Sequence, residues 1–168
     1  NESSMAVVDI KEKVNVVSIK TKSQPVNITI DPHCEVFRRF YTEEIPPTID
    51  SLLGDENKIM VYPTGGEAAS QLAYKKLAHL LAGNRGLVKA DKEITETEVA
   101  QKSLFVLGGL ENKLTGAFLA NVPKNFLLKE GEFTAGNVTY RNTGDALLVA
   151  VKNPKSKGKG VALFFGIG

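Results

Sequence analysis

The sequence contains little cysteine or histidine and lacks tryptophan. It has one cysteine, two histidines and no tryptophan among 168 residues. The single cysteine, Cys34, excludes an internal disulfide, and a nucleophilic role would require a nearby base and a lowered thiol pKa. His33 precedes Cys34, but neighbouring side chains diverge in an extended segment. An inert, partly buried thiol is therefore favoured over a catalytic one.

Metal-binding and hydrolase signatures are also missing. The sequence contains no HExxH motif, no CxxC motif and no acidic cluster with ligand spacing. No GxSxG elbow supports a Ser-His-Asp triad, although the sequence alone leaves a hidden triad open. We therefore expect no catalytic residue, no metal site and no cofactor in this chain.

Charge and hydropathy exclude two further classes of partner. The net charge is +2, which is too small to attract nucleic acid or anionic lipid over the whole surface. No apolar run approaches the roughly 20 residues of a membrane-spanning helix. The hydrophobic content of 42% is typical of a globular protein with a real core. We expect no nucleic-acid partner and no membrane span.

Residues 1–30 have the pattern of β-strands. Apolar and polar residues alternate in parts of residues 5–20 and again in residues 24–31, with a polar turn between them. A two-stranded hairpin is marginally stable alone in water. We therefore expect residues 1–30 to be the closing strands of a preceding β-sandwich, or to pack on the domain that follows.

Residues 55–168 alternate between short apolar runs and helical patterns. The runs at 58–63 and 103–109 are typical of buried strands, and residues 86–90 are predicted to be the strand between them. A helix is predicted over residues 67–83, with its apolar stripe formed by Ala69, Leu72, Ala73, Leu77 and either Leu80 or Leu81. A hairpin around Gly136-Asn137 and two more apolar strands complete the pattern.

This order of elements predicts an α/β fold. We expect a three-layer, open, mostly parallel sheet of flavodoxin or Rossmann type, preceded by an N-terminal β-hairpin. The strand VALFFG lies two residues from the end of the sequence, without the covering helix that is usual in such folds. We expect either truncation there or coverage of the exposed face by the hairpin.

Two glycine-rich turns are the candidate ligand-binding site. Thr64, Gly65 and Gly66 follow the first buried strand, and Gly108, Gly109 and Asn112 follow the third. Open α/β sheets bind ligands at the carboxyl ends of their strands, and glycines let backbone N–H groups approach an anion. The turns match neither the P-loop nor the dinucleotide fingerprint, and Glu67 would repel a phosphate. The alternative is a tight turn with Thr64 as the helix N-cap.

The loop at residues 152–159 holds four lysines among glycine, proline and serine. Solvated lysines in a turn are the expected explanation, because little aromatic interleaving is present to stack on single-stranded nucleic acid.

Residues 31–54 are predicted to be a connecting strap and a short helix. Pro32 ends the preceding strand, and Pro46-Pro47 stiffens the exit. The expected domain-interface residues are an apolar anchor and two pairs of opposite charges: Phe37, Arg38, Arg39, Glu43 and Glu44.

The stretch IDPHCEVFRRFYTEEIPPTIDSLLG, residues 30–54, resembles a segment of bacterial proteins related to the aminopeptidase N-like zinc peptidases. SLFVLGGLENKL and GNVTYRNTGDALLVAVKNPKSKGKGVALFFG are similar to the C-terminal α/β domain of those proteins, so that the resemblance covers residues 25–166. The HExxH helix and distal glutamate of the family are not in this sequence, so no catalytic residue can be carried over. The turn at residues 108–112 also departs from the family, which tends to have a proline before the asparagine.

The resemblance implies a non-catalytic C-terminal accessory region of a peptidase-like protein. Such a region would dock on a catalytic body that is missing from this chain, or shape access to it, and would lie outside the cytoplasm of a bacterium. The alternative from the residues themselves is a small-ligand domain that holds an anion or nucleotide at the two glycine-rich turns. An independent enzyme that uses Cys34 or a hidden serine triad is the third possibility.

Overall fold

A computed structural model describes residues 3–41, 44–156 and 158–168. The chain divides into two units, Asn1–Arg39 and Phe40–Gly168. The boundary falls inside the predicted strap of residues 31–54. None of the helices in the described ranges is long and apolar enough to cross a membrane.

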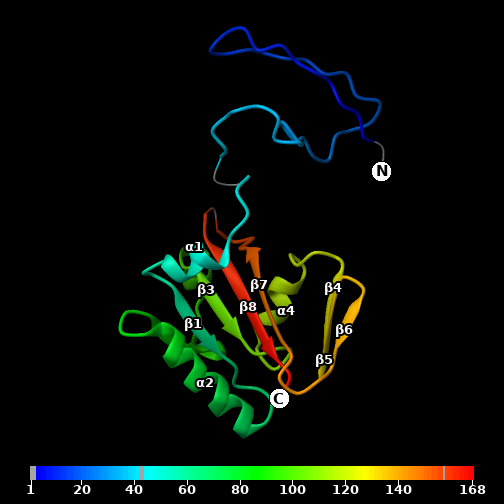
Figure 1. The fold of residues 1–168 in the computed structure, drawn as a ribbon. Helices are drawn as coiled ribbons and strands as arrows, with labels where there is room; N and C mark the ends of the chain where they lie inside the picture. Colours follow the sequence, from blue (N-terminus) through cyan, green and yellow to red (C-terminus); the bar gives the residue numbers. More distant parts are fainter. Residues whose placement is uncertain (1–2, 42–43, 157) are drawn as a thin grey trace. The chain divides into compact units, whose positions relative to one another are not determined.

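The first unit is extended and irregular (Figure 1). Its described residues, 3–39, contain no helix and no strand. The predicted N-terminal β-hairpin is therefore not confirmed. The physical reason lies in the surroundings of the segment, because two strands need a sheet or a core on which to bury their apolar face. Val16 and Val26, which the alternating pattern placed on that face, are 94% and 101% exposed.

The second unit is built on a five-stranded sheet. Its strands are β1 (Ile59–Tyr62), β2 (Leu87–Ala90), β3 (Leu104–Leu107), β7 (Ala146–Lys152) and β8 (Gly160–Gly166), in the order β2-β1-β3-β8-β7. The pairs β1–β2, β1–β3 and β3–β8 are parallel, and β7 is antiparallel to β8. The predicted mixed α/β fold with a mostly parallel sheet is thus confirmed, whereas the flavodoxin-like three-layer arrangement stays a prediction.

In the described ranges, one α-helix precedes β1, and three α-helices and one 3-10 helix lie between the strands. They are α1 (Ile49–Gly54), α2 (Ala68–Ala82), η1 (Asp91–Glu93), α3 (Glu96–Gln101) and α4 (Thr115–Leu119). A capping box begins α1, since the Thr48 hydroxyl accepts from the Ser51 N–H at 3.1 Å and the Ser51 hydroxyl accepts from the Thr48 N–H at 3.2 Å. Pro47 and Leu52 pack against Gly160 at the start of β8, where an added Cβ would lie 2.8 Å from each side chain.

The predicted buried stripe of α2 is wrong except at Leu77. The residues that α2 buries are Ala78 and Ala82, with Tyr74 and Leu77 partly buried beside them. Leu72, which was predicted to be buried, is 54% exposed, and the alternatives Leu80 and Leu81 are 77% and 38% exposed. Small side chains let the helix approach a sheet face that already carries large residues, and leucines on the other side of the helix do not contribute to that contact.

Each face of the central sheet carries its own apolar cluster. On one face, alternate residues of β1, β3 and β8 pack with Val99 of α3 and Phe118 of α4. On the other face, Met60, Phe105 and Ala162 pack against α1 and α2. The two faces follow from the period of a strand, in which successive side chains point to opposite sides.

A second, antiparallel sheet joins the unit between α4 and β7. It consists of β4 (Phe126–Lys129), β5 (Glu132–Ala135) and β6 (Val138–Tyr140), in the order β4-β5-β6 (Figure 1). The predicted hairpin around Gly136-Asn137 is confirmed as the β5–β6 connection, whereas β4 was not predicted. Phe133 anchors the sheet, because its ring stacks on Tyr140 at 4.8 Å and meets the edge of Phe165 on β8 at 6.0 Å.

Candidate functional site

The two predicted glycine-rich turns lie against each other at the carboxyl edge of the central sheet. The first follows β1 and the second follows β3, and these strands are parallel neighbours. A Cβ added to Gly65 would lie 2.6 Å from the carbonyl oxygen of Glu111, and one added to Gly66 would lie 3.2 Å from the Glu111 Cβ. The β1 strand has β2 on its other side, so the turns meet at a topological switch point.

The glycines of the second turn are required by close packing. Gly109 leaves room for the ring of Phe165, since an added Cβ would lie 2.6 Å from the ring carbon Cδ2. Gly108 has φ +94°, a conformation that side chains other than glycine rarely adopt, and an added Cβ would approach the Pro63 ring to 3.0 Å. Close packing of the Pro63 and Phe165 side chains on this turn therefore accounts for both glycines.

The carboxylate of Glu111 lies over the second turn. Its oxygens are 3.3 Å and 3.1 Å from the Cβ positions that Gly108 and Gly109 would have. Burial raises the pKa of the Tyr74 hydroxyl, and the charge of Glu111 raises it further, against a backbone hydrogen bond from Gly166 that lowers it. The carboxylate of Glu111 at this position disfavours binding of an anion. This repulsion was predicted for Glu67, but Glu67 is exposed at the start of α2.

Asp91 links the turns that follow β1 and β3. It is 3% exposed. Its carboxylate accepts hydrogen bonds from the Thr64 hydroxyl at 2.6 Å and from the Lys113 N–H at 2.9 Å. Thr64 is therefore not the N-cap of α2, a position that Glu67 occupies without a side-chain cap bond. Sequence reasoning missed Asp91, although its place directly after the β2 strand was a usable signal.

The side-chain amide of Asn112 forms hydrogen bonds with the backbone around it. Its side chain is buried at 1% exposure. The amide nitrogen donates to the Leu107 carbonyl at 2.9 Å and to the Val61 carbonyl at 3.4 Å, and its oxygen accepts from the Leu114 N–H at 3.0 Å. Asn112 thus joins β1 to β3 and sets the start of α4.

The opposite, amino edge of the sheet carries an ionic cluster around Asp55. The Asp55 carboxylate accepts hydrogen bonds from the Lys159 ammonium and from the Ser103 hydroxyl, both at 2.7 Å. Burial raises the pKa of Asp55, but these hydrogen bonds outweigh burial and lower the pKa to about 2. The cluster ties together the segments that lead into β1, β3 and β8.

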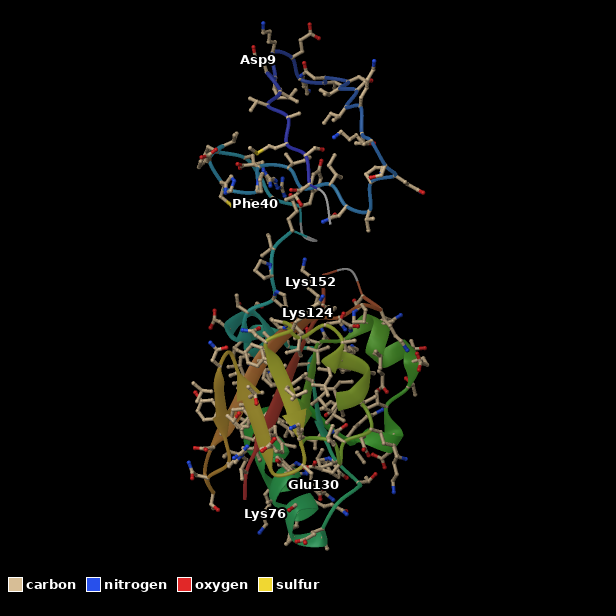
Figure 2. All side chains as sticks on the ribbon, turned by 90° about the vertical axis from the view of Figure 1, so that its right-hand side faces the viewer. Asp9, Phe40, Lys76, Lys124, Glu130 and Lys152 are labelled. Atoms are coloured by element: carbon tan, nitrogen blue, oxygen red, sulfur yellow. The ribbon has the colours of Figure 1, made fainter. Side chains whose placement is uncertain are left out.

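The lysine loop between β7 and β8 is partly engaged rather than simply solvated. Lys155 forms an ion pair with Glu96, and Lys159 forms one with Asp55. Asn153 is buried, and its amide donates to the Val99 carbonyl at 2.6 Å. Lys157 lies outside the described residues. Figure 2 shows Lys152 and Lys124 at this end of the second unit, with Glu130 and Lys76 at the other end.

The predicted interface residues of the strap lie in different surroundings. Arg38 folds back within the first unit, because its guanidinium donates to the Ile30 carbonyl at 3.0 Å and lies 3.7 Å from the Asp31 carboxylate. Phe37 is fully exposed and Arg39 is exposed. In the second unit, the Glu44 carboxylate accepts from the Tyr41 N–H at 2.8 Å. Glu43 lies outside the described residues.

The described residues offer no metal centre. Nowhere in the described ranges do three His, Cys, Asp or Glu side chains form a group that could hold a metal ion. Cys34 is exposed in the first unit, beside His33, so the predicted partial burial of its thiol is wrong. His79 is exposed on α2.

An apolar cavity of about 20 Å³ lies in the second unit, with Leu119, Phe126, Leu147 and Leu163 among its lining residues. This cavity has room for little more than one water molecule, so it is too small for a substrate.

Comparisons with known proteins add no relative. No protein-family model matches the chain, and no curated protein sequence matches it.

Proposed function

We propose that this chain is a non-catalytic accessory region, in which an α/β domain is attached to a separate β-rich body through the first unit. The observation that carries the proposal is the exposure of large apolar side chains in residues 3–39. Val7, Val16, Val26 and Phe37 are 97%, 94%, 101% and 107% exposed. Burial of such a side chain stabilises a protein by about 1.5–3 kcal/mol, so a partner that covers them gains a substantial driving force.

The pattern of these residues indicates the kind of partner. Val26, Ile28 and Ile30 alternate with polar residues, as on a half-buried strand. All three are exposed, and residues 3–39 contain no strand in the described chain. A sheet edge on a neighbouring body would supply both the backbone hydrogen bonds and the apolar surface that this segment needs.

The carboxyl edge of the central sheet supports a role without chemistry. At the switch point, where α/β domains usually bind ligands, Glu111 from the same chain packs against the glycines of both turns. The polar atoms of Asn112 and Asp91 are bonded to neighbouring groups of the protein. Anion or nucleotide binding at these turns, the alternative, would require Glu111 to move.

The resemblance of residues 30–54 to peptidase-associated proteins suggests what the neighbouring body is. Under this proposal, the second unit docks on a peptidase-like body or shapes access to its active site, outside the cytoplasm. The chain itself has no peptidase activity. Purified protein, with and without added zinc, is expected to cleave aminoacyl-coumarin substrates no faster than a heat-denatured sample.

Hydrogen exchange tests the attachment directly. In the 168-residue chain, the amides of residues 14–30 are expected to exchange without protection, while those of β1, β3 and β8 are protected. In a longer polypeptide that includes the preceding region, residues 14–30 are expected to become protected. Absence of protection in the longer polypeptide would contradict the proposal.

A matched pair of variants identifies the apolar face that docks. Ile28→Asp is expected to abolish protection of residues 24–30 in the longer polypeptide. Asn27→Asp adds the same charge to the other face of the strand and is expected to leave protection in place. Neither substitution is expected to change the unfolding of the second unit. Equal effects of the two variants would show that the alternating face is not the contact.

A further inference from the structure

We draw no further inference here: the strongest candidate, the outward face of α2, where Leu72 and Leu80 lie 54% and 77% exposed on the side away from the buried Ala78 and Ala82, carries nothing because nothing in the structure shows what covers it.

Discussion

The ammonium of Lys159 donates a 2.7 Å hydrogen bond to the carboxylate of Asp55, across the amino edge of the sheet. Asp55 follows α1 at the entrance to β1, and Lys159 lies at the entrance to β8. Because the Asp55 side chain is only 14% exposed, this ion pair is better shielded from solvent than an ordinary surface pair. It links the segments that lead into β1 and β8, two strands that lie on either side of β3.

This pair is expected to make stability depend on pH. The pKa of Asp55 falls from 3.8 to about 2 in the folded protein, so the unfolded chain binds more protons in this range. The stabilisation is complete above pH 3.8 and is lost as the pH falls through about 2. Its size is at most about 2.5 kcal/mol, at roughly 1.4 kcal/mol per pKa unit, and solvent screening reduces it.

Urea unfolding of Asp55→Asn at several pH values measures this contribution. At pH 7 the variant is expected to be less stable than the wild type by about 1–2 kcal/mol, and the difference should shrink as the pH falls towards 2. Glu56→Gln is the control, because Glu56 forms only an exposed pair with Arg85 and should change stability by less than about 0.5 kcal/mol. A difference for Asp55→Asn that does not vary with pH would contradict the expectation.

Gly65→Ala is expected to destabilise the second unit. The new methyl group would lie 2.6 Å from the Glu111 carbonyl oxygen, and backbone must shift to relieve that contact. Overpacking of this kind costs about 1–3 kcal/mol, which should appear as a lower melting temperature. Gly116→Ala is the matched control, since a Cβ there meets nothing within 4 Å and alanine favours the α4 helix. Equal melting temperatures for the two variants would show that the turns do not pack closely.

Asn112→Ala is expected to cost more stability than its loss of volume suggests. The substitution leaves the buried Leu107 carbonyl and the Leu114 N–H without their side-chain partner. An unsatisfied buried polar group costs about 1–3 kcal/mol. Denaturant unfolding should show a loss in this range for Asn112→Ala, whereas Asn121→Ala, at an exposed position, should be nearly neutral. A neutral Asn112→Ala would argue that these hydrogen bonds are replaced by water.

Titration of tyrosine absorbance is expected to show a late phase for Tyr74. Burial and the Glu111 charge raise the pKa of its hydroxyl above the ordinary 10.0, so the folded state favours the neutral form. Stability should therefore fall as the pH rises beyond 10. The Tyr74→Phe variant should lack the late phase, and Glu111→Gln should move the phase to lower pH. A late phase that persists in Tyr74→Phe belongs to another tyrosine.

Thermal-shift measurements distinguish the proposed function from ligand binding. Inorganic phosphate, nucleotides and flavins are expected to leave the melting temperature unchanged, whereas a ligand at 100 times its Kd would add about 2.7 kcal/mol of stability. Removal of the charge in Glu111→Gln would strengthen binding of an anion at the carboxyl edge, and Glu130→Gln is the control. A phosphate-induced shift that grows only in Glu111→Gln would favour the ligand-binding alternative.

The central sheet could be predicted from the sequence because strands that are buried on both faces consist of short continuous apolar runs. The positions of β1, β3 and β8 could be seen in KIMVYP, SLFVLGG and VALFFG. The meeting of the two glycine-rich turns also followed from their place after neighbouring parallel strands.

Features that depend on tertiary contacts could not be predicted in this way. The helix α2 carries apolar residues on both sides, so periodicity alone did not show that Ala78, rather than Leu72, faces the sheet. The role of Asp91 depends on Thr64 and Lys113, which only the fold brings near it. The alternating pattern of residues 5–20 predicts a strand, but a strand also needs a neighbour, which the pattern does not contain.

The position of β8 has a consequence for how the domain folds. This strand lies between β3 and β7, although β3 is separated from it in sequence by α4 and the whole second sheet. During synthesis, β1, β2 and β3 emerge before β8. The edge of β3 is then unpaired, and the β3 side chains that are buried in the folded domain are exposed. A nascent chain halted before Gly160 would therefore be prone to aggregate, and the slow step of folding should be the long-range closure of β8 against β3.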